Sequence, residues 1–187
     1  MPTGKLVRLR AVELDDLDRS FAWINDAEVT RYLAHQSAYP FSRAQEEEWI
    51  RGAVKRTQPP DLTYAIETLE DARHIGSIGL HGMLNNAHKA ELGILIGDKT
   101  CWNRGFGTDA IVTMLKFAFD HINLNRVVLE VHDDNARAIA CYRKCGFIEE
   151  GLLRQDRYRD GEYGDTIVMG VLREEFRAQG SQRMGSG

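Results

Sequence analysis

A short turn with two glycines, placed between an apolar strand pattern and an apolar helix pattern, constrains this chain more than any other feature. The strand pattern covers Ala90–Gly97, the turn covers Trp102–Ala110, and the helix pattern runs from about Gly105 to His121. Glycine lets the backbone approach a ligand closely, and the first amides of a helix have no acceptor within it. Such a helix start attracts anions. The turn therefore predicts a phosphate site, with a helix that merely begins tightly as the alternative.

The strand and helix patterns along the chain predict one α/β domain. Its 187 residues suit a single domain with a sizeable core. Alternating or β-branched apolar runs predict strands over residues 5–10, 62–69, 74–84, 90–97, 126–132, 147–157 and 162–172. Periodic apolar positions predict helices over residues 14–25, 43–57, 105–121 and 136–144. We expect a mixed, twisted sheet of about six to seven strands with about four helices in residues 1–175, and a flexible tail over residues 176–187.

Local signals mark where several of these elements begin and end. Ser42 and Gln45 have the spacing of a capping box before the helix that starts near residue 43. Gly146 stands where a helix ends in a left-handed residue. Asp160 followed by Gly161 predicts a tight hairpin between the last two strands.

Composition and charge exclude several classes of partner. The net charge is −4 and the isoelectric point is about 5.9, without the basic stripe of a nucleic-acid binder. No apolar run reaches the length of a membrane span, and the start lacks a secretory pattern. We expect no nucleic-acid partner, no membrane contact and a cytoplasmic location. No cluster has the spacing of metal ligands, so we expect no metal. Cys141 and Cys145 are either a redox or metal pair or, as we favour, small apolar residues of the core.

Two other phosphate motifs compete for the turn. The P-loop requires Gly-Lys-Ser/Thr, which is missing. The dinucleotide fingerprint is formally matched by Gly105, Gly107 and Ala110. That fingerprint normally opens a repeated strand–helix–strand array, whereas here successive strands precede it and a hairpin follows. A nicotinamide-dependent oxidoreductase therefore stays as a less favoured alternative.

A second segment, Asn135–Phe147, decides between these alternatives. Asn135, Ala138, Tyr142, Lys144 and the following Gly-Phe pair match an N-x-x-(A/S)-x-x-x-Y-x-K-x-G-F pattern. Together with the glycine turn, this segment resembles the GNAT superfamily of N-acetyltransferases. The flanking words Ala-Glu-Leu-Gly, Leu-Asn-Arg and Glu-Gly-Leu are similar to the branch that holds ribosomal-protein alanine acetyltransferases and spermidine acetyltransferases. The resemblance covers about residues 5–175. One departure is that Trp102 and Asn103 stand where the family has Arg or Gln and then Gly.

The resemblance implies a fold in which the strands near 90–97 and 126–132 splay apart to admit acetyl-CoA. It implies a diphosphate site on the amides of Arg104, Gly105, Phe106, Gly107 and Thr108. It also implies that the edge of the strand at Ile94, Leu95 and Ile96 pairs with the pantetheine arm, and that Asn135 hydrogen-bonds this arm from the other side.

The same resemblance implies that the Tyr142 phenol lies near the thioester sulfur. Tyrosine is protonated at neutral pH and can donate its proton to a departing thiolate. Its alternative role is that of a buried ring whose hydroxyl bonds to the backbone. Glu91 is the first candidate to accept the proton of the attacking amine, with a salt bridge or cation binding as its alternative. Glu130 and His132 share a face of the next strand, and His132 is a weaker candidate base.

We therefore predict transfer of acetyl from acetyl-CoA to a primary amine by direct attack. The acceptor is a polyamine, a protein N-terminus or another small amine, and the acidic charge slightly favours a polyamine. Trp23, Tyr32, Tyr39 and Trp49 form either an acceptor wall or plain core. A non-catalytic sensor of acyl-CoA is the main alternative function. The last two strands leave an edge through which a homodimer is plausible.

Overall fold

The computed structural model describes residues 1–33, 39–83 and 86–184, and the side chains only as far as residue 180. Its strands are β1 Val7–Ala11, β2 Thr57–Gln58, β3 Asp61–Thr68, β4 His74–His81, β5 Lys89–Ile96, β6 Arg126–His132, β7 Ile148–Arg159 and β8 Glu162–Leu172. Its α-helices are α1 Leu17–Ile24, α2 Ala27–Thr30, α3 Arg43–Lys55, α4 Phe106–Asp120, α5 Ala136–Cys145 and α6 Arg173–Met184.

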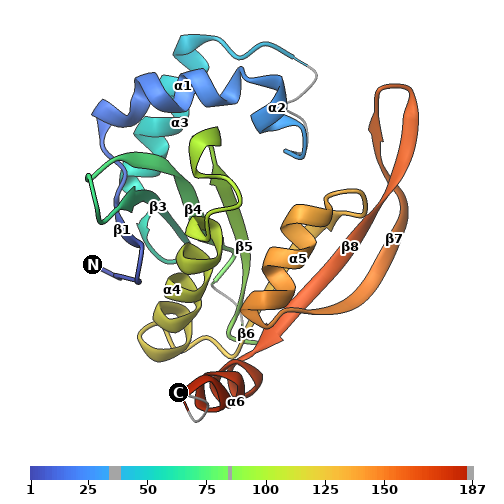
Figure 1. Cartoon of the computed structure of the whole chain (residues 1–187). Helices are drawn as coiled ribbons and strands as arrows, with labels where there is room; N and C mark the ends of the chain where they lie inside the picture. Colours follow the sequence, from blue (N-terminus) through green and yellow to red (C-terminus); the bar gives the residue numbers. More distant parts are fainter. Residues whose placement is uncertain (34–38, 84–85, 185–187) are drawn as a thin grey trace.

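The strands form one mixed sheet in the order β1-β3-β4-β5-β6-β8-β7, with the short β2 added to β3. Every neighbouring pair is antiparallel except β5 and β6, which the helix α4 connects as a parallel pair. The α/β class and the mixed sheet predicted from the sequence are confirmed. Figure 1 shows the long β7–β8 hairpin extending away from the rest of the sheet.

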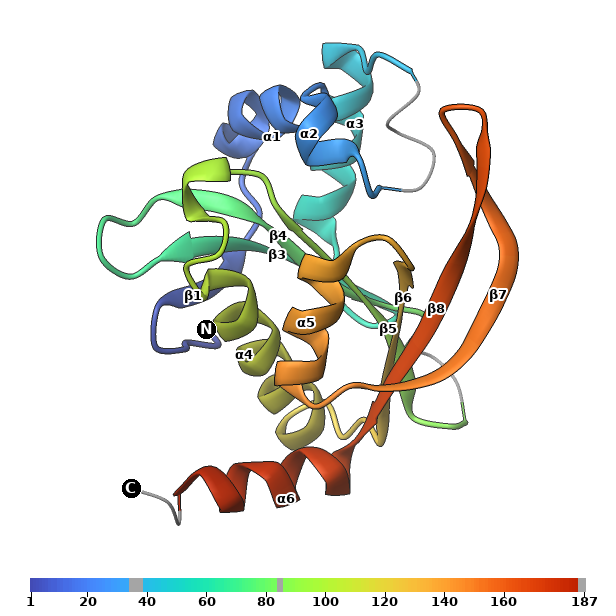
Figure 2. The ribbon, with the colours of Figure 1, turned by 45° about the vertical axis from the view of Figure 1, so that its right-hand side comes forward.

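Helices cover both faces of the sheet. The helices α4 and α5 lie side by side against one face, as Figure 2 shows, and their apolar residues join Ile66, Ile78 and Leu129 in the main core. On the other face α3 contributes Ile50 and Ala53 to a smaller cluster. Because neighbouring residues of a strand point to opposite faces, the single strand β3 supplies both layers.

The strands β5 and β6 are paired over only three residues. Lys89–Glu91 lie opposite Arg126–Val128, and beyond Glu91 the two strands separate. This is the splay that the sequence predicted between residues 90–97 and 126–132. The separation leaves one edge of β5 without a strand neighbour.

The predicted local signals form as expected. The Ser42 hydroxyl accepts from the Gln45 amide at 3.2 Å, and the Gln45 side chain accepts from the Ser42 amide at 2.9 Å. Gly146 ends α5 in the left-handed region, with φ of 103°. Asp160 and Gly161 both have positive φ, as a tight hairpin turn between β7 and β8 requires.

Three elements differ from the sequence-based expectation. The two-residue β2 and the four-residue α2 are too short to produce a periodic pattern. Where a flexible tail was expected over residues 176–187, the chain continues into α6 as far as Met184. Phe176 of this helix packs on Phe119, with ring centres 5.5 Å apart. This apolar contact lies in an otherwise polar segment that has no apolar periodicity. Residues 185–187 lie outside the described part.

Candidate functional site

A cleft of about 1040 Å³ lies where β5 and β6 separate. The first turn of α4, the helix α5 and the end of β7 complete its walls. Ile94, Leu95 and Ile96 all line it, along the edge of β5 that faces away from β4. The described residues therefore provide a long groove with backbone groups of an open strand edge along one side.

The glycine turn places the start of α4 at this cleft. Gly105 is the residue before the helix and has φ of 87°, which favours glycine. The first intrahelical bond is made by the Asp109 amide, so the amides of Phe106, Gly107 and Thr108 precede the ladder. Gly105, Gly107 and Thr108 line the cleft, and a Cβ atom on Gly107 would meet nothing closer than 3.7 Å. This end of the cleft has the geometry of an anion site.

Two of the predicted phosphate residues contribute no side chain there. The Phe106 ring is buried in the core, and the Arg104 guanidinium lies over it and donates to the Thr100 carbonyl. Neither side chain lines the cleft.

Arg137 is a cleft residue that the sequence analysis missed. Its guanidinium carbon lies 3.8 Å from the centre of the Trp102 ring, and both side chains line the cleft. The Trp102 indole donates to the Ile96 carbonyl at 2.7 Å, which fixes the ring against the end of β5. Arg137, in the first turn of α5, therefore places its charge beside Trp102 in the turn before α4. In the superfamily pattern, the position of Trp102 is itself an Arg or Gln. In the sequence, only the position of Arg137 two residues after Asn135 could have indicated that it lies in the cleft.

Asn135 and Tyr142 enter the same cleft from α5. The Asn135 carbonyl oxygen caps the helix by accepting from the Ala138 amide at 3.2 Å, which leaves its amide nitrogen as a donor. Tyr142 packs edge-on against Phe147, and its hydroxyl bonds to none of the described residues. Burial raises the pKa of Tyr142, and the nearby Cys141 and Cys145 add to the rise. The phenol is thus protonated and available, rather than tied to the backbone.

Carboxylates gather where β5 and β6 begin to separate. Glu91 is exposed and is the last residue of β5 that pairs with β6. It lines the cleft together with Glu130 of β6. Burial raises the pKa of Glu130, with the negative charges of Glu91 and Asp156 acting in the same direction. His132 shares this face, as predicted, but burial lowers its pKa, as do the cations Arg157 and Arg159.

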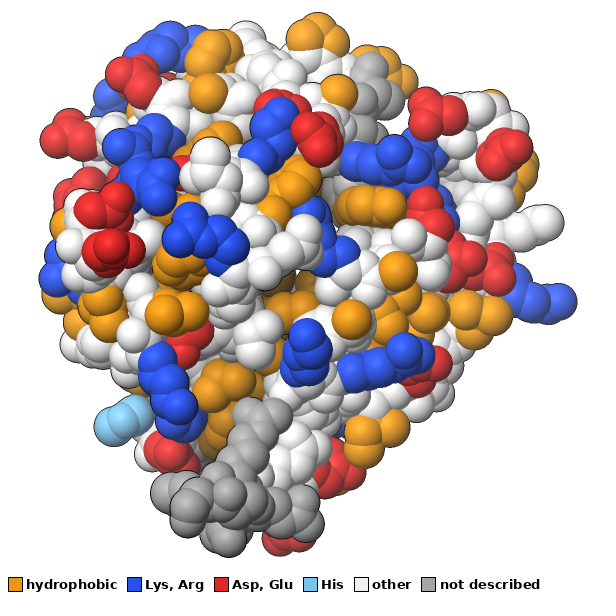
Figure 3. All heavy atoms as spheres, viewed as in Figure 1, with side chains coloured by type: hydrophobic (Ala, Val, Ile, Leu, Met, Phe, Trp, Pro, Cys, Tyr) orange, Lys and Arg blue, Asp and Glu red, His pale blue; other side chains and the backbone are white. Residues whose placement is uncertain are grey.

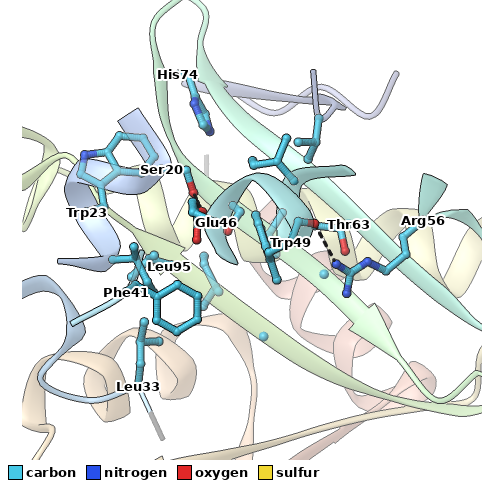
Figure 4. Close-up of a pocket in the computed structure, with 18 of the residues that line it drawn as sticks. Ser20, Trp23, Leu33, Phe41, Glu46, Trp49, Arg56, Thr63, His74 and Leu95 are labelled. Carbon is cyan, nitrogen blue, oxygen red and sulfur yellow. Dashed lines mark hydrogen bonds between the residues drawn. The ribbon is translucent and has the colours of Figure 1, made fainter. Parts of the chain in front are cut away.

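A smaller cavity of about 210 Å³ adjoins the cleft across β5. Leu33, Gly93, Ile94 and Leu95 line both spaces. Figure 4 shows Trp23, Phe41 and Trp49 around the smaller cavity, together with polar side chains from α1, α3 and β3. Of the four aromatic residues singled out earlier, Trp23 and Trp49 line this cavity, Tyr32 lines the cleft, and Tyr39 is exposed.

Charge on the surface is mixed. Figure 3 shows acidic and basic side chains interspersed over the face seen in Figure 1. Within the described ranges, no helix is long and apolar enough to cross a membrane, and no group of His, Cys, Asp or Glu side chains has the arrangement of a metal site.

Comparison with known proteins identifies the fold. A family model described as an acetyltransferase (GNAT) domain matches residues 7–148. The chain belongs to the GNAT acetyltransferase family. It is therefore an acyltransferase whose co-substrate is acetyl-CoA. The alternative of a nicotinamide-dependent oxidoreductase is not supported.

Relatives and solved structures of this GNAT chain agree with that assignment. It is 32% identical to a spermidine N(1)-acetyltransferase of Vibrio cholerae over 90% of this chain and 94% of the relative. It is 28% identical to an uncharacterized N-acetyltransferase of Bacillus subtilis, over 92% and 96% of the two chains. A crystal structure of Vibrio cholerae spermidine N-acetyltransferase in complex with CoA and spermine superimposes with a TM-score of 0.81 at 25% identity, covering 91% of this chain and 98% of that chain.

Proposed function

We propose that this GNAT protein acetylates a small primary amine by direct attack on acetyl-CoA, with the thioester held between β5 and α5. The observation that carries the proposal is the order of groups along the cleft. Unpaired amides of α4 lie at one end, the Tyr142 phenol lies in the wall, and a second cavity adjoins it at Gly93–Leu95. Acetyl-CoA supplies the activated acetyl group and the thiolate leaving group.

The amides of residues 104–108 bind the diphosphate, and the Arg137 guanidinium adds a charge-assisted contact. The backbone of Ile94, Leu95 and Ile96 pairs with the pantetheine arm as an added strand would. The Asn135 amide nitrogen donates to the arm from the opposite wall. These contacts fix the position of the reacting carbonyl beside β5.

Tyr142 donates its phenolic proton to the sulfur as the thiolate leaves. Its raised pKa keeps the proton on the phenol throughout the neutral range. A backbone amide near the end of β5 stabilises the negative charge that develops on the acetyl oxygen. Glu91, directly or through a water molecule, accepts the proton of the incoming amine. Glu130 lines the same part of the cleft, and the charge of Glu91 contributes to its raised pKa.

The cysteines matter for the choice between direct attack and a two-step route through an acetylated enzyme. Cys101 is buried and burial raises its thiol pKa, so it is a poor nucleophile. Cys141 lines the cleft, and hydrogen bonds from Cys145 and Thr108 lower its pKa to about 6 despite burial. An acetylated enzyme would therefore carry the acetyl group on Cys141 if the reaction used two steps.

The test is thiol release from acetyl-CoA with spermidine and with peptides that begin with alanine or serine. We expect turnover that requires an amine, an unchanged protein mass when acetyl-CoA is added alone, and continued turnover in Cys141→Ala. Acetyl on Cys141, with loss of turnover in that variant, would replace direct attack by a two-step route. If no amine accelerates thiol release while CoA binds, the sensor function is the correct one.

We further propose a homodimer through β7. Ile148, Leu152, Leu153 and Tyr158 of this edge strand expose between 40% and 66% of their surface, and an edge strand offers unpaired backbone groups. Sedimentation equilibrium should give twice the chain mass, and Leu152→Glu should shift it toward the monomer. A monomer at all concentrations would refute the dimer.

We place the protein in the cytoplasm. None of Cys101, Cys141 and Cys145 forms a disulfide in the structure, which fits a reducing compartment. Fractionation of cells that express the protein checks this location.

A further inference from the structure

A row of small residues leads from the cofactor cleft across the sheet. Thr63 of β3 lies opposite Gly79 of β4, and Gly79 lies opposite Gly93 of β5. Residues directly opposite each other in an antiparallel pair point to the same face, and all three line the smaller cavity. Two strand spacings separate Thr63 from Gly93, which is about 10 Å. The two glycines contribute no side chains to this row, and the His81 ring lies over it, with its Nε2 atom 2.9 Å from the place of a Cβ atom on Gly79.

The Thr63 end of the row holds two buried polar atoms without a partner. Thr63 is 4% exposed, and its hydroxyl oxygen makes no hydrogen bond in the described structure. The Arg56 Nε atom is likewise buried and unpartnered, and Arg56 also lines the cavity. A buried polar atom without a partner is costly, so such a pair marks a place where a ligand or water belongs.

Arg56 is held in place and lacks a carboxylate. Its Nη2 atom donates to the Trp49 carbonyl at 3.3 Å, and its guanidinium lies 5.6 Å from the Trp49 ring centre. Among the described residues no Asp or Glu forms an ion pair with it, and the undescribed segments contain no Asp or Glu. The cation therefore faces the cavity without a carboxylate in ion-pair contact among the described residues.

We infer that the acceptor amine carries a carboxylate or similar small oxyanion, which Arg56 and Thr63 bind at the far end of the row from Gly93. The inference rests on the proposed acetyl transfer and names its substrate class. A guanidinium and a hydroxyl together offer the donors that a carboxylate accepts. The reactive amine then lies near Gly93 and Leu95, where the cavity meets the cleft.

The one buried carboxylate of the cavity lies at its other end. Glu46 accepts a hydrogen bond from the Ser20 hydroxyl, and Figure 4 shows Trp49 between Glu46 and the Arg56–Thr63 pair. The remaining ionisable side chains of the cavity, His74 and His81, each lie close to an aspartate, Asp16 and Asp61 respectively. Arg56 is thus the cation available to an acceptor.

The test compares acceptors that differ only in the distal group. The probes are ε-aminocaproate, its uncharged amide ε-aminocaproamide, the diamine cadaverine, and spermidine. We expect kcat/KM for the carboxylate to exceed that for the amide by about 10- to 100-fold. Arg56→Gln and Thr63→Val should each reduce this preference, and Arg56→Gln should favour cadaverine relative to the carboxylate, because it removes a cation near the distal ammonium. Arg51→Gln, on the exposed side of the same helix, should leave the preference intact.

Binding of caproate to the protein saturated with CoA, measured by calorimetry, supplies a readout that does not depend on turnover. We expect wild type to bind caproate and Arg56→Gln to lose that binding while its melting temperature is retained. If wild type uses the carboxylate and the amide equally, or if Arg56→Gln keeps the full preference for the carboxylate, the inference is overturned while the proposed acetyl transfer is retained. Failure of every probe to be acetylated, with CoA bound, overturns both.

Discussion

At the scale of single residues, Tyr142 lines the cleft and is the proposed proton donor to the leaving thiolate. Its ring is fixed against Phe147 while its hydroxyl makes no bond to the described residues. Burial keeps the phenol protonated by raising its pKa. The side chain is therefore placed to donate a proton rather than to support the core through its oxygen.

Replacing Tyr142 by phenylalanine should lower kcat by about 100-fold or more, because it removes the proton donor for the thiolate. The affinity for CoA should change little, since the ring and its packing are kept. Steady-state kinetics and calorimetry with CoA measure the two effects. A variant with full kcat would show that water or another group protonates the sulfur.

Arg137 is the residue that supplies charge near the open end of α4. Arg137→Ala should weaken CoA binding by about tenfold or more, because it removes a charge-assisted contact to phosphate. Arg143→Ala on the same helix is the control, since Arg143 is exposed and pairs with Glu149. Equal CoA affinity in wild type and Arg137→Ala would mean that the backbone amides bind the diphosphate alone.

At the scale of elements, one side chain connects the start of α4 to the N-terminal segment. The Asp109 carboxylate accepts the amides of Lys5, Leu6 and Val7 at 3.0, 2.7 and 3.0 Å. Three backbone donors therefore depend on a carboxylate from the helix that carries the anion site.

Asp109→Ala should lower the free energy of unfolding by about 2–4 kcal/mol, because it leaves these amides without their acceptor. Urea unfolding measures the change. Asp120→Ala, which breaks only an exposed ion pair with Arg177 near the end of the same helix, should cost less than about 1 kcal/mol. Similar losses in the two variants would contradict the special role of Asp109.

A buried ion network connects the first helical turn to the sheet. Arg10 of β1 contacts both Asp16 and Glu67, and His74 of β4 lies 3.1 Å from Asp16. Burial alone would raise the pKa of Asp16, but hydrogen bonds from Arg10 and His74 outweigh it and hold this pKa well below its usual range. The folded state thus favours the ionised carboxylate.

Stability from Asp16 is present above the pKa that this group has in the unfolded chain, about 3.9, and is lost as the pH falls below it. The free energy of unfolding should therefore decline more steeply below about pH 4 in wild type than in Asp16→Asn. Urea unfolding at a series of pH values measures both slopes, and the exposed Asp18→Asn serves as the control substitution. Parallel slopes for wild type and Asp16→Asn would show that other carboxylates cause the acid sensitivity.

At the scale of the whole molecule, the cleft divides the sheet into two parts. Three residue pairs between β5 and β6 connect them. The part from β1 to β5 carries the open strand edge, and the part from β6 to β8 carries α5 against it. A ligand in the cleft contacts both parts and so adds connections that the protein alone lacks.

CoA should therefore raise the melting temperature, and at 100 times its dissociation constant it should add about 2.7 kcal/mol to the free energy of unfolding. Hydrogen exchange should slow in β5 and in α5 together. NAD at the same concentration is the control and should have no effect. Stabilisation by NAD but not by CoA would contradict the assignment of the cleft.

Features that depend on neighbouring residues could be predicted from the sequence. The glycine turn before α4, the capping box at Ser42 and the hairpin at Asp160 follow from backbone preferences and short-range hydrogen bonds. The motif around Tyr142 identified the family for the same reason, because its residues lie on one helix. The short α2 and the helix α6 escaped prediction, since neither has enough apolar residues to show a period.

Contacts between residues far apart in the chain could not be predicted, because they depend on how the sheet and the helices pack. Trp102 and Arg137 are brought together by the packing of α4 on α5, and Thr63, Gly79 and Gly93 are aligned by the register of three strands. Strand register and helix packing depend on the whole core rather than on local preference. The residues proposed to bind the cofactor through their backbone could therefore be named from the sequence. The cation beside the cleft and the row toward Arg56 depend on how the sheet and helices assemble.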